Sequence, residues 1–180
     1  PTGPVALVDC IASGAVRIFA AGQWYEFRDG KWQVNATLKP GNDTQFTFAD
    51  SKGQPAQAPL PWREVRQVLR AGPINYVAGA RACLAVPQGG EAVSLSWQEG
   101  LTVRQIAVSP EGVLHVASSA GLWALHGKEW QQVRVLDEGG RAWAMGDVLG
   151  AAFDSKGRLW FATKAGVGCQ TAEGWRFYEG

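Results

Sequence analysis

The chain has 180 residues, of which 46% are hydrophobic, and its 17 Lys and Arg nearly balance its 16 Asp and Glu. A net charge of +1 provides no chain-wide attraction for nucleic acid or an anionic membrane, since such binding depends on clustered basic residues. The composition is that of a folded protein, and no apolar run of ~18 residues that could span a bilayer occurs. We therefore expect neither nucleic acid nor direct membrane insertion among its interactions.

The first predicted element is a short strand at residues 5–8, followed by the segment Gly14–Trp32. Turn residues at Gly22 and at 28–30 divide that segment into further strands. The next segment, 37–61, contains several prolines and interrupts the pattern, so we interpret it as an insertion. Residues 48–53 (FADSKG) are similar in sequence to residues 153–157 (FDSKG), so we allow for a hairpin inside the insertion.

The second unit begins with a segment, Trp62–Arg70, that could be helical by composition. Its alignment with Leu101–Val108 favours a strand. Pro73–Val86 aligns with a later stretch, residues 112–125, although Pro73 replaces the expected turn glycine. Trp97 is our candidate for the packing tryptophan that this degenerate unit otherwise lacks.

The repeat is clearest between the third and fourth units. Gly112–Trp130 overlays Gly157–Trp175 at a constant offset of 45, with six identities in 19 positions. In the fourth unit, Asp154–Gly157 predicts a hairpin turn, because Asp can accept hydrogen bonds from the backbone that follows and Gly tolerates the left-handed conformation. Aromatic and β-branched residues follow each turn, so each unit is predicted to be a meander of four antiparallel strands.

Units of about 45 residues that are apolar on both faces must stack on one another. We therefore predict an all-β fold, a β-propeller made of about four four-stranded antiparallel blades. The predicted blades are 1–36, 62–99, 101–138 and 145–180, with 37–61 as an inter-blade insertion in one propeller region, 1–180. Because the chain opens with an inner strand after Pro1 and closes with an outer one, we expect part of a larger ring. A compact four-bladed ring is the alternative.

Residues 153–168 (FDSKGRLWFATKAGVG), together with 175–178 (WRFY), resemble the two-component-regulator propeller repeat. The resemblance implies periplasmic or secreted sensor regions and a blade motif that is structural, with no shared catalytic residues. It therefore predicts a periplasmic or extracellular location for this chain.

Catalytic and metal chemistry finds little support in the sequence. His115 takes a variable strand position, His126 lies between two strands, and no HxH or HExxH spacing is present. Acidic residues such as Asp154 fall in turns. The three widely spaced cysteines, Cys10, Cys83 and Cys169, are interpreted as small buried apolar residues. We accordingly assign no catalytic residue, metal ligand or cofactor.

Ligand contacts are expected on the loops that join blades, where residues break the repeat. Trp32, Trp130 and Trp175 share one repeat position and are assigned to packing between blades instead. The candidate ligand-binding residues are Trp62, Arg63, Arg104, Arg141, Trp143 and Asp147.

These observations predict a non-enzymatic ligand-sensing or recognition module that binds through inter-blade loops. Its ligand could be a small molecule, a glycan or a protein, and further blades or a signalling domain could accompany it. One alternative is a protein–protein interaction scaffold. Another is a propeller enzyme similar to the streptogramin lyases, which would require His115 or His126 to face the central axis beside a Glu.

Overall fold

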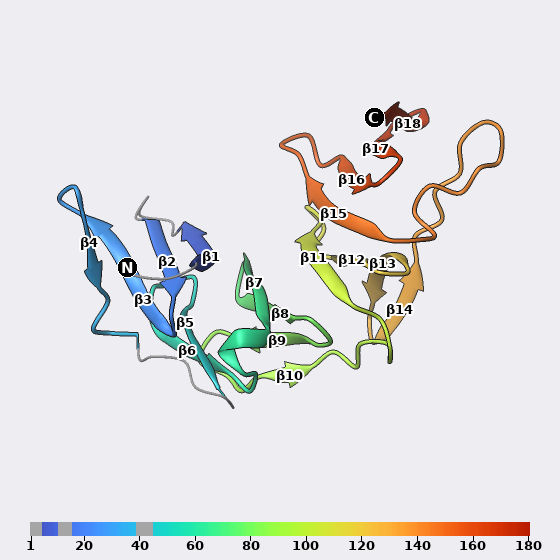
Figure 1. Cartoon of the computed structure of the whole chain (residues 1–180). Coiled ribbons are helices and arrows are strands. Elements are labelled where there is room, and N and C mark those ends of the chain that lie inside the picture. Colours follow the sequence, from blue (N-terminus) through green and yellow to red (C-terminus); the bar gives the residue numbers. More distant parts are fainter. Residues whose placement is uncertain (1–4, 11–15, 39–44) are drawn as a thin grey trace. The chain divides into compact units, whose positions relative to one another are not determined.

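In the computed structural model, contacts divide the chain into two compact units. Unit 1 comprises residues 1–79 and 83–95, and unit 2 comprises 80–82 and 96–180. The structure describes residues 5–10, 16–38 and 45–180, with the backbone alone described for 5–10. Every regular sheet in this part of the chain is antiparallel, which confirms the all-β prediction (Figure 1).

Unit 1 contains two four-stranded sheets and one two-stranded hairpin. The first sheet has the order β1-β2-β3-β4, formed by Val5–Cys10, Val16–Ala20, Gln23–Arg28 and Lys31–Val34. The hairpin consists of β5 (Phe46–Ala49) and β6 (Pro55–Ala58). The second sheet has the order β10-β9-β8-β7, formed in chain order by Val65–Ala71, Ile74–Gly79, Cys83–Pro87 and Val93–Ser94.

Unit 2 contains two further sheets with the same meander order. The third sheet is formed by β11 to β14, at Val103–Val108, Leu114–Ser118, Gly121–His126 and Glu129–Gln132. The fourth is formed by β15 to β18, at Val148–Phe153, Leu159–Thr163, Gly166–Thr171 and Gly174–Glu179. Both follow the strand and turn pattern expected from the repeat. The number of blades in a ring and the single-region boundaries stay predictions.

The first strand of each four-stranded sheet carries a register shift at its beginning, next to Ala6, Arg66, Arg104 and Leu149 respectively. Such bulges bend a strand and re-aim the extra side chain. In unit 2, β11 and β15 lie side by side, and the side-chain Oε1 of Gln105 accepts a 3.1 Å hydrogen bond from the backbone N–H of Ala151. The two blades of this unit are therefore joined through their first strands.

The core of unit 2 lies between its two sheets. Ala117 and Leu122 of the third blade are fully buried against Val148 and Phe161 of the fourth, and Trp175 packs on the edge of this cluster. The assigned packing role holds for Trp175. Trp32, however, is 38% exposed and contacts Phe27 of its own blade. It lies on β4, the edge strand of the first sheet.

The inserted segment is part of the core of unit 1. Phe46, Phe48 and Ala49 of β5 are fully buried, and the Phe46 ring lies 5.3 Å from that of Phe19. The indole N–H of Trp24 donates a 2.6 Å hydrogen bond to the carbonyl of Thr47. The predicted hairpin is confirmed, and it serves as a packed cover for one face of the first blade.

Two local predictions need correction. Trp62–Glu64 forms a short 3₁₀ helix before β7 begins at Val65, so only the rest of that segment is a strand. Trp97 does not complete the second blade: it belongs to unit 2, where its ring lies 4.9 Å from that of Trp130. Its indole N–H also donates to the carbonyl of Leu101, which ties it to the chain entering the third blade.

Candidate functional site

A cavity of 260 Å³ opens in unit 1 at the polar end of the first blade, beside the turn of the hairpin. Arg17 on β2, Glu26 on β3 and Gln33 on β4 are register partners across the sheet. Partners in adjacent antiparallel strands present their side chains on the same face, so the sheet itself brings these polar groups together. The described lining residues are Arg17, Glu26, Arg28, Gln33, Val34, Asn35, Ala36, Thr37, Leu38 and Gly53.

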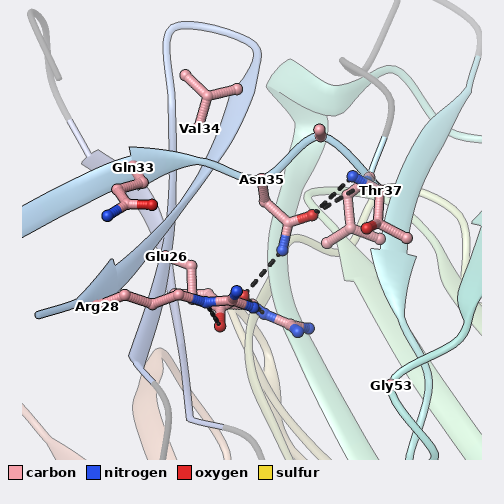
Figure 2. Close-up of a pocket in the computed structure, with 10 residues that line it drawn as sticks. Glu26, Arg28, Gln33, Val34, Asn35, Thr37 and Gly53 are labelled. Carbon is pink, nitrogen blue, oxygen red and sulfur yellow. Dashed lines mark hydrogen bonds and ion pairs between the residues drawn. The ribbon is translucent and has the colours of Figure 1, made fainter.

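Glu26 is the centre of the hydrogen-bond network at this cavity. Its Oε2 accepts from Nε of Arg17 at 3.0 Å and from Nδ2 of Asn35 at 2.9 Å, and its Oε1 accepts from Nε of Arg28 at 2.7 Å. Figure 2 shows Asn35 directed at Glu26, with the Arg28 side chain alongside the carboxylate. Both carboxylate oxygens are therefore occupied by donors from three positions.

The chain after β4 is held in place by the same network. Oδ1 of Asn35 accepts hydrogen bonds from the backbone N–H groups of Thr37 and Leu38, at 3.0 and 3.1 Å. An Asn that caps the backbone following it fixes a local turn. The turn places Thr37 at the rim and buries Leu38, so the wall is shaped before any ligand arrives.

Electrostatics keep Glu26 ionised. The hydrogen bond from Arg28 and the charge of Arg17 lower the pKa of the Glu26 carboxyl, whereas burial opposes the shift. Arg17 and Glu26 are both buried, while the Arg28 side chain is 62% exposed. Replacing a buried ion pair by apolar residues is often neutral or stabilising, so stability alone is a weak reason for this cluster.

Two of the ligand-binding residues predicted from the sequence, Arg104 and Asp147, meet in unit 2. Nε and Nη2 of Arg104 donate to the two oxygens of Asp147 at 3.1 and 3.4 Å. Arg104 is next to the bulge of β11, and Asp147 immediately precedes β15. Both side chains are about one-third exposed, so the pair bridges neighbouring blades at the surface.

Arg141 and Trp143 form a second pair, in the turn before the fourth blade. The guanidinium of Arg141 lies 4.4 Å from the Trp143 ring centre, and the indole N–H donates a 3.0 Å hydrogen bond to Asp137. Trp143 itself lies in the core of unit 2. It is 6% exposed, and its ring stacks on that of Phe177 at 4.4 Å. The structure thus gives Trp143 a packing role, and Arg141 pairs with Asp137 and Glu179.

Trp62 and Arg63 are adjacent on the 3₁₀ helix of unit 1. The Trp62 ring packs at 5.4 Å against Phe19 and lies over Gly22, and the Arg63 guanidinium is 5.2 Å from that ring. The six predicted residues therefore occur as three neighbouring pairs, each with its own contacts. Their role in binding stays a prediction.

The histidines and cysteines are held in packed surroundings. His115 is half-buried, its ring lies 5.1 Å from Phe153, and burial lowers the pKa of its imidazole. Cys83 and Cys169 are buried free thiols, and burial raises the pKa of Cys83 to about 12. The prediction of buried apolar cysteines is confirmed for these two, while the side chain of Cys10 lies outside the described residues. No group of three His, Cys, Asp or Glu that could hold a metal occurs in the described ranges.

Sequence reasoning missed the cavity residues Arg17, Glu26, Arg28 and Asn35. Arg17 takes the strand position that Tyr76, His115 and Trp160 take in the other units, and the residue type at that position varies. The available signal was a charged residue on each of two consecutive strands of one predicted hairpin. Only the register shows that Arg17 lies opposite Glu26.

Comparisons with known proteins place the chain at the level of fold. No family model and no curated protein sequence matches it. Among solved structures, virginiamycin B lyase from Staphylococcus aureus superposes with a TM-score of 0.66 at 13% identity, over 99% of this chain and 70% of the lyase. The extracellular domain of the hybrid two-component system BT3049 from B. thetaiotaomicron gives 0.66 at 17% identity, over 99% of this chain and 29% of that one.

A second sensor-type neighbour is the extracellular domain of the one-component system BT4673 from B. thetaiotaomicron, with a TM-score of 0.64 and 14% identity. The match covers 94% of this chain and 27% of that domain. The sequence resemblance to two-component-regulator propellers is thus matched by structural neighbours of that kind. At these identities the likeness shows the propeller fold, which these extracellular domains and the lyase share.

Proposed function

We propose that the chain is a non-enzymatic recognition module of a β-propeller protein, which binds a small polar ligand in the cavity beside Arg17, Glu26 and Asn35. The observation that carries this proposal is a buried ion-pair network in the wall of an open 260 Å³ cavity. A few fixed polar groups converging on a concave site are typical of small-molecule recognition.

The loop residues predicted from the sequence supply further candidate contacts, on each unit separately, within the same proposed function. Arg104 with Asp147, and Arg63 over Trp62, leave charged groups at the surface of their respective units. An ion pair that is one-third exposed can exchange partners at little cost, since such pairs contribute about 0–1 kcal/mol.

An extracellular or periplasmic location is part of the proposal. Its support is the description of two neighbours as extracellular domains. The described residues contain no helix long and apolar enough to cross a membrane. Fractionation of cells that express the protein, with detection by an antibody raised against these 180 residues, tests the location.

Binding can be tested with a set of small polar compounds, including amino acids, monosaccharides and organic acids, by ¹H–¹⁵N NMR. We expect at least one compound to shift the backbone amides of β2, β3 and residues 35–38 and to be recovered unchanged by mass spectrometry. The variant Ala36→Trp, which fills the cavity, should abolish the shifts. Ala172→Trp, at an exposed turn of unit 2, should leave them intact.

Two results would overturn this function. If no compound perturbs the cavity amides, the cavity is not a ligand site, and the alternative of a protein–protein interaction scaffold is favoured. If a compound is converted into product, the module is an enzyme. In that case His115→Ala and His126→Ala would show whether the lyase alternative applies, because a histidine variant of the S. aureus lyase is described as catalytically inactive.

A further inference from the structure

Arg17 is the residue at the cavity whose hydrogen bonding is incomplete. Its side chain is 9% exposed, and Nη1 is buried without a hydrogen-bond partner among the described residues. Its Nε is already engaged by Glu26. A buried charged donor without a partner costs free energy, so such groups are usually satisfied by protein, water or a ligand. This guanidinium therefore keeps one donor that no described residue uses, on a side chain that lines the cavity.

The charge at the cavity is positive. Of the described lining residues, Arg17, Arg28 and Glu26 are the charged ones, which leaves one positive charge in excess. The carboxylate that could attract a cation is saturated, because three side-chain donors already occupy its two oxygens. Asn35 is largely committed too, because its amide oxygen accepts from two backbone N–H groups and its side-chain nitrogen donates to Glu26.

The groups left for a ligand are donors and neutral polar groups. Arg28 extends to solvent beyond its bond with Glu26, and Thr37 and Gln33 lie on the rim. Guanidinium groups recognise oxyanions through charge-assisted hydrogen bonds. We propose that this cavity binds the oxyanion group of a small molecule, either a carboxylate or a phosphate or sulfate ester, between Arg17 and Arg28. The proposal rests on the proposed function and specifies the ligand class of the same site.

The experiment uses four simple probes, acetate, inorganic phosphate, sulfate and acetamide, and follows the side-chain Nε–Hε resonances of Arg17 and Arg28 by NMR. Acetate and acetamide have nearly the same shape and differ in charge. We expect the anions to shift both resonances in a saturable manner and acetamide to leave them unchanged. A preference for acetate over phosphate and sulfate would identify a carboxylate ligand, and the reverse would identify a tetrahedral oxyanion.

Two variants distinguish recognition from a purely structural network. Arg28→Gln, at an exposed position, should weaken anion binding about tenfold, the effect of losing one charge-assisted hydrogen bond. Glu26→Gln should instead tighten anion binding, because it removes the competing negative charge, even though it lowers the thermal stability. Arg134→Gln, an exposed arginine of unit 2, is the matched control and should change nothing.

The proposal is wrong if the anions shift the Arg134 control region as strongly as the cavity, or if Glu26→Gln folds and binds anions more weakly. Should neutral compounds occupy the cavity while anions do not, the ligand class is wrong and the recognition function stands. Should neither neutral nor anionic compounds perturb the cavity, both fail.

Discussion

The indole N–H of Trp160 donates a 2.9 Å hydrogen bond to Oδ2 of Asp154, six residues earlier at the start of the same hairpin. Oδ1 of Asp154 accepts from the backbone N–H groups of Lys156 and Arg158, and Nε of Arg158 donates to Oδ2 at 2.7 Å. Asp137 makes the same set of bonds with Gly139, Arg141 and Trp143. The spacing Asp-x-x-Gly-Arg-x-Trp therefore forms one structural device twice in unit 2.

The first prediction concerns acid stability through Asp154. The Trp160 indole and the Arg158 backbone N–H hold the pKa of the Asp154 carboxyl well below its ordinary value. Its contribution to stability is therefore present above the unfolded-state pKa of about 3.9 and lost as pH falls through the folded value. Asp154→Asn should be less stable than the unaltered protein at pH 7, and the difference should shrink between pH 4 and 2.

Urea unfolding at pH 7, 4 and 2.5 measures this difference. The exposed Glu99→Gln is the control and should show no comparable pH-dependent difference. A gap between Asp154→Asn and the unaltered protein that is constant across the three pH values would show that the carboxylate charge is not what stabilises this turn.

The second prediction concerns His115. Burial lowers the pKa of its imidazole below the ordinary value near 6.5, so the folded state disfavours the protonated form. Stability from this residue is complete above pH 6.5 and falls as the pH drops through that value towards the folded pKa. His115→Gln should therefore lose less stability than the unaltered protein between pH 7.5 and 5.

Denaturant titrations at both pH values provide the measurement, and Arg134→Gln, at an exposed position, is the control. Two other titratable groups also affect the pKa of the His115 imidazole: the charge of His126 lowers it further, and the charge of Glu111 raises it. An identical pH dependence in His115→Gln and in the unaltered protein would contradict the prediction.

The third prediction concerns Gly168 on β17. A Cβ at this position would overlap the ring of Phe161, which is buried between the two blades of unit 2. Gly168→Ala should destabilise unit 2 by about 1–3 kcal/mol, the usual cost of overpacking a core. Gly146→Ala, where an added Cβ meets nothing within 4 Å, should change stability by about 0.5 kcal/mol or less. Equal effects of the two substitutions in thermal unfolding would refute the packing assignment.

The fourth prediction concerns the inserted hairpin. Phe46 is fully buried against Phe19, Trp24 and Phe48, so Phe46→Ala should cost about 3–5 kcal/mol. Phe27→Ala, the same substitution at a ring that is 46% exposed, should cost about 1 kcal/mol. Urea unfolding monitored by tryptophan fluorescence distinguishes the two. A Phe46→Ala variant as stable as Phe27→Ala would mean that the segment 37–61 is a dispensable insertion.

The strands of blades three and four could be predicted closely because their turns are local. Asp154 and Gly157 specify a hairpin through bonds within five residues, and Gly157 has a φ of +74° that glycine adopts readily. The degenerate second blade was predicted less well. The repeat alignment placed the turn-glycine position of this blade at Pro73. The turn glycine in the structure is Gly72, so the predicted position was one residue too late.

The sequence by itself determined the repeat, the all-β class and the turn positions of the third and fourth blades, because these depend on residues near one another in the chain. The cavity depended on tertiary structure. Glu26 acquires its partners Arg17 and Asn35 through strand register and a following turn, and β5 becomes core by folding back over Phe19. Periodicity reports which face a residue takes, whereas the groups that meet across strands are decided by register and packing.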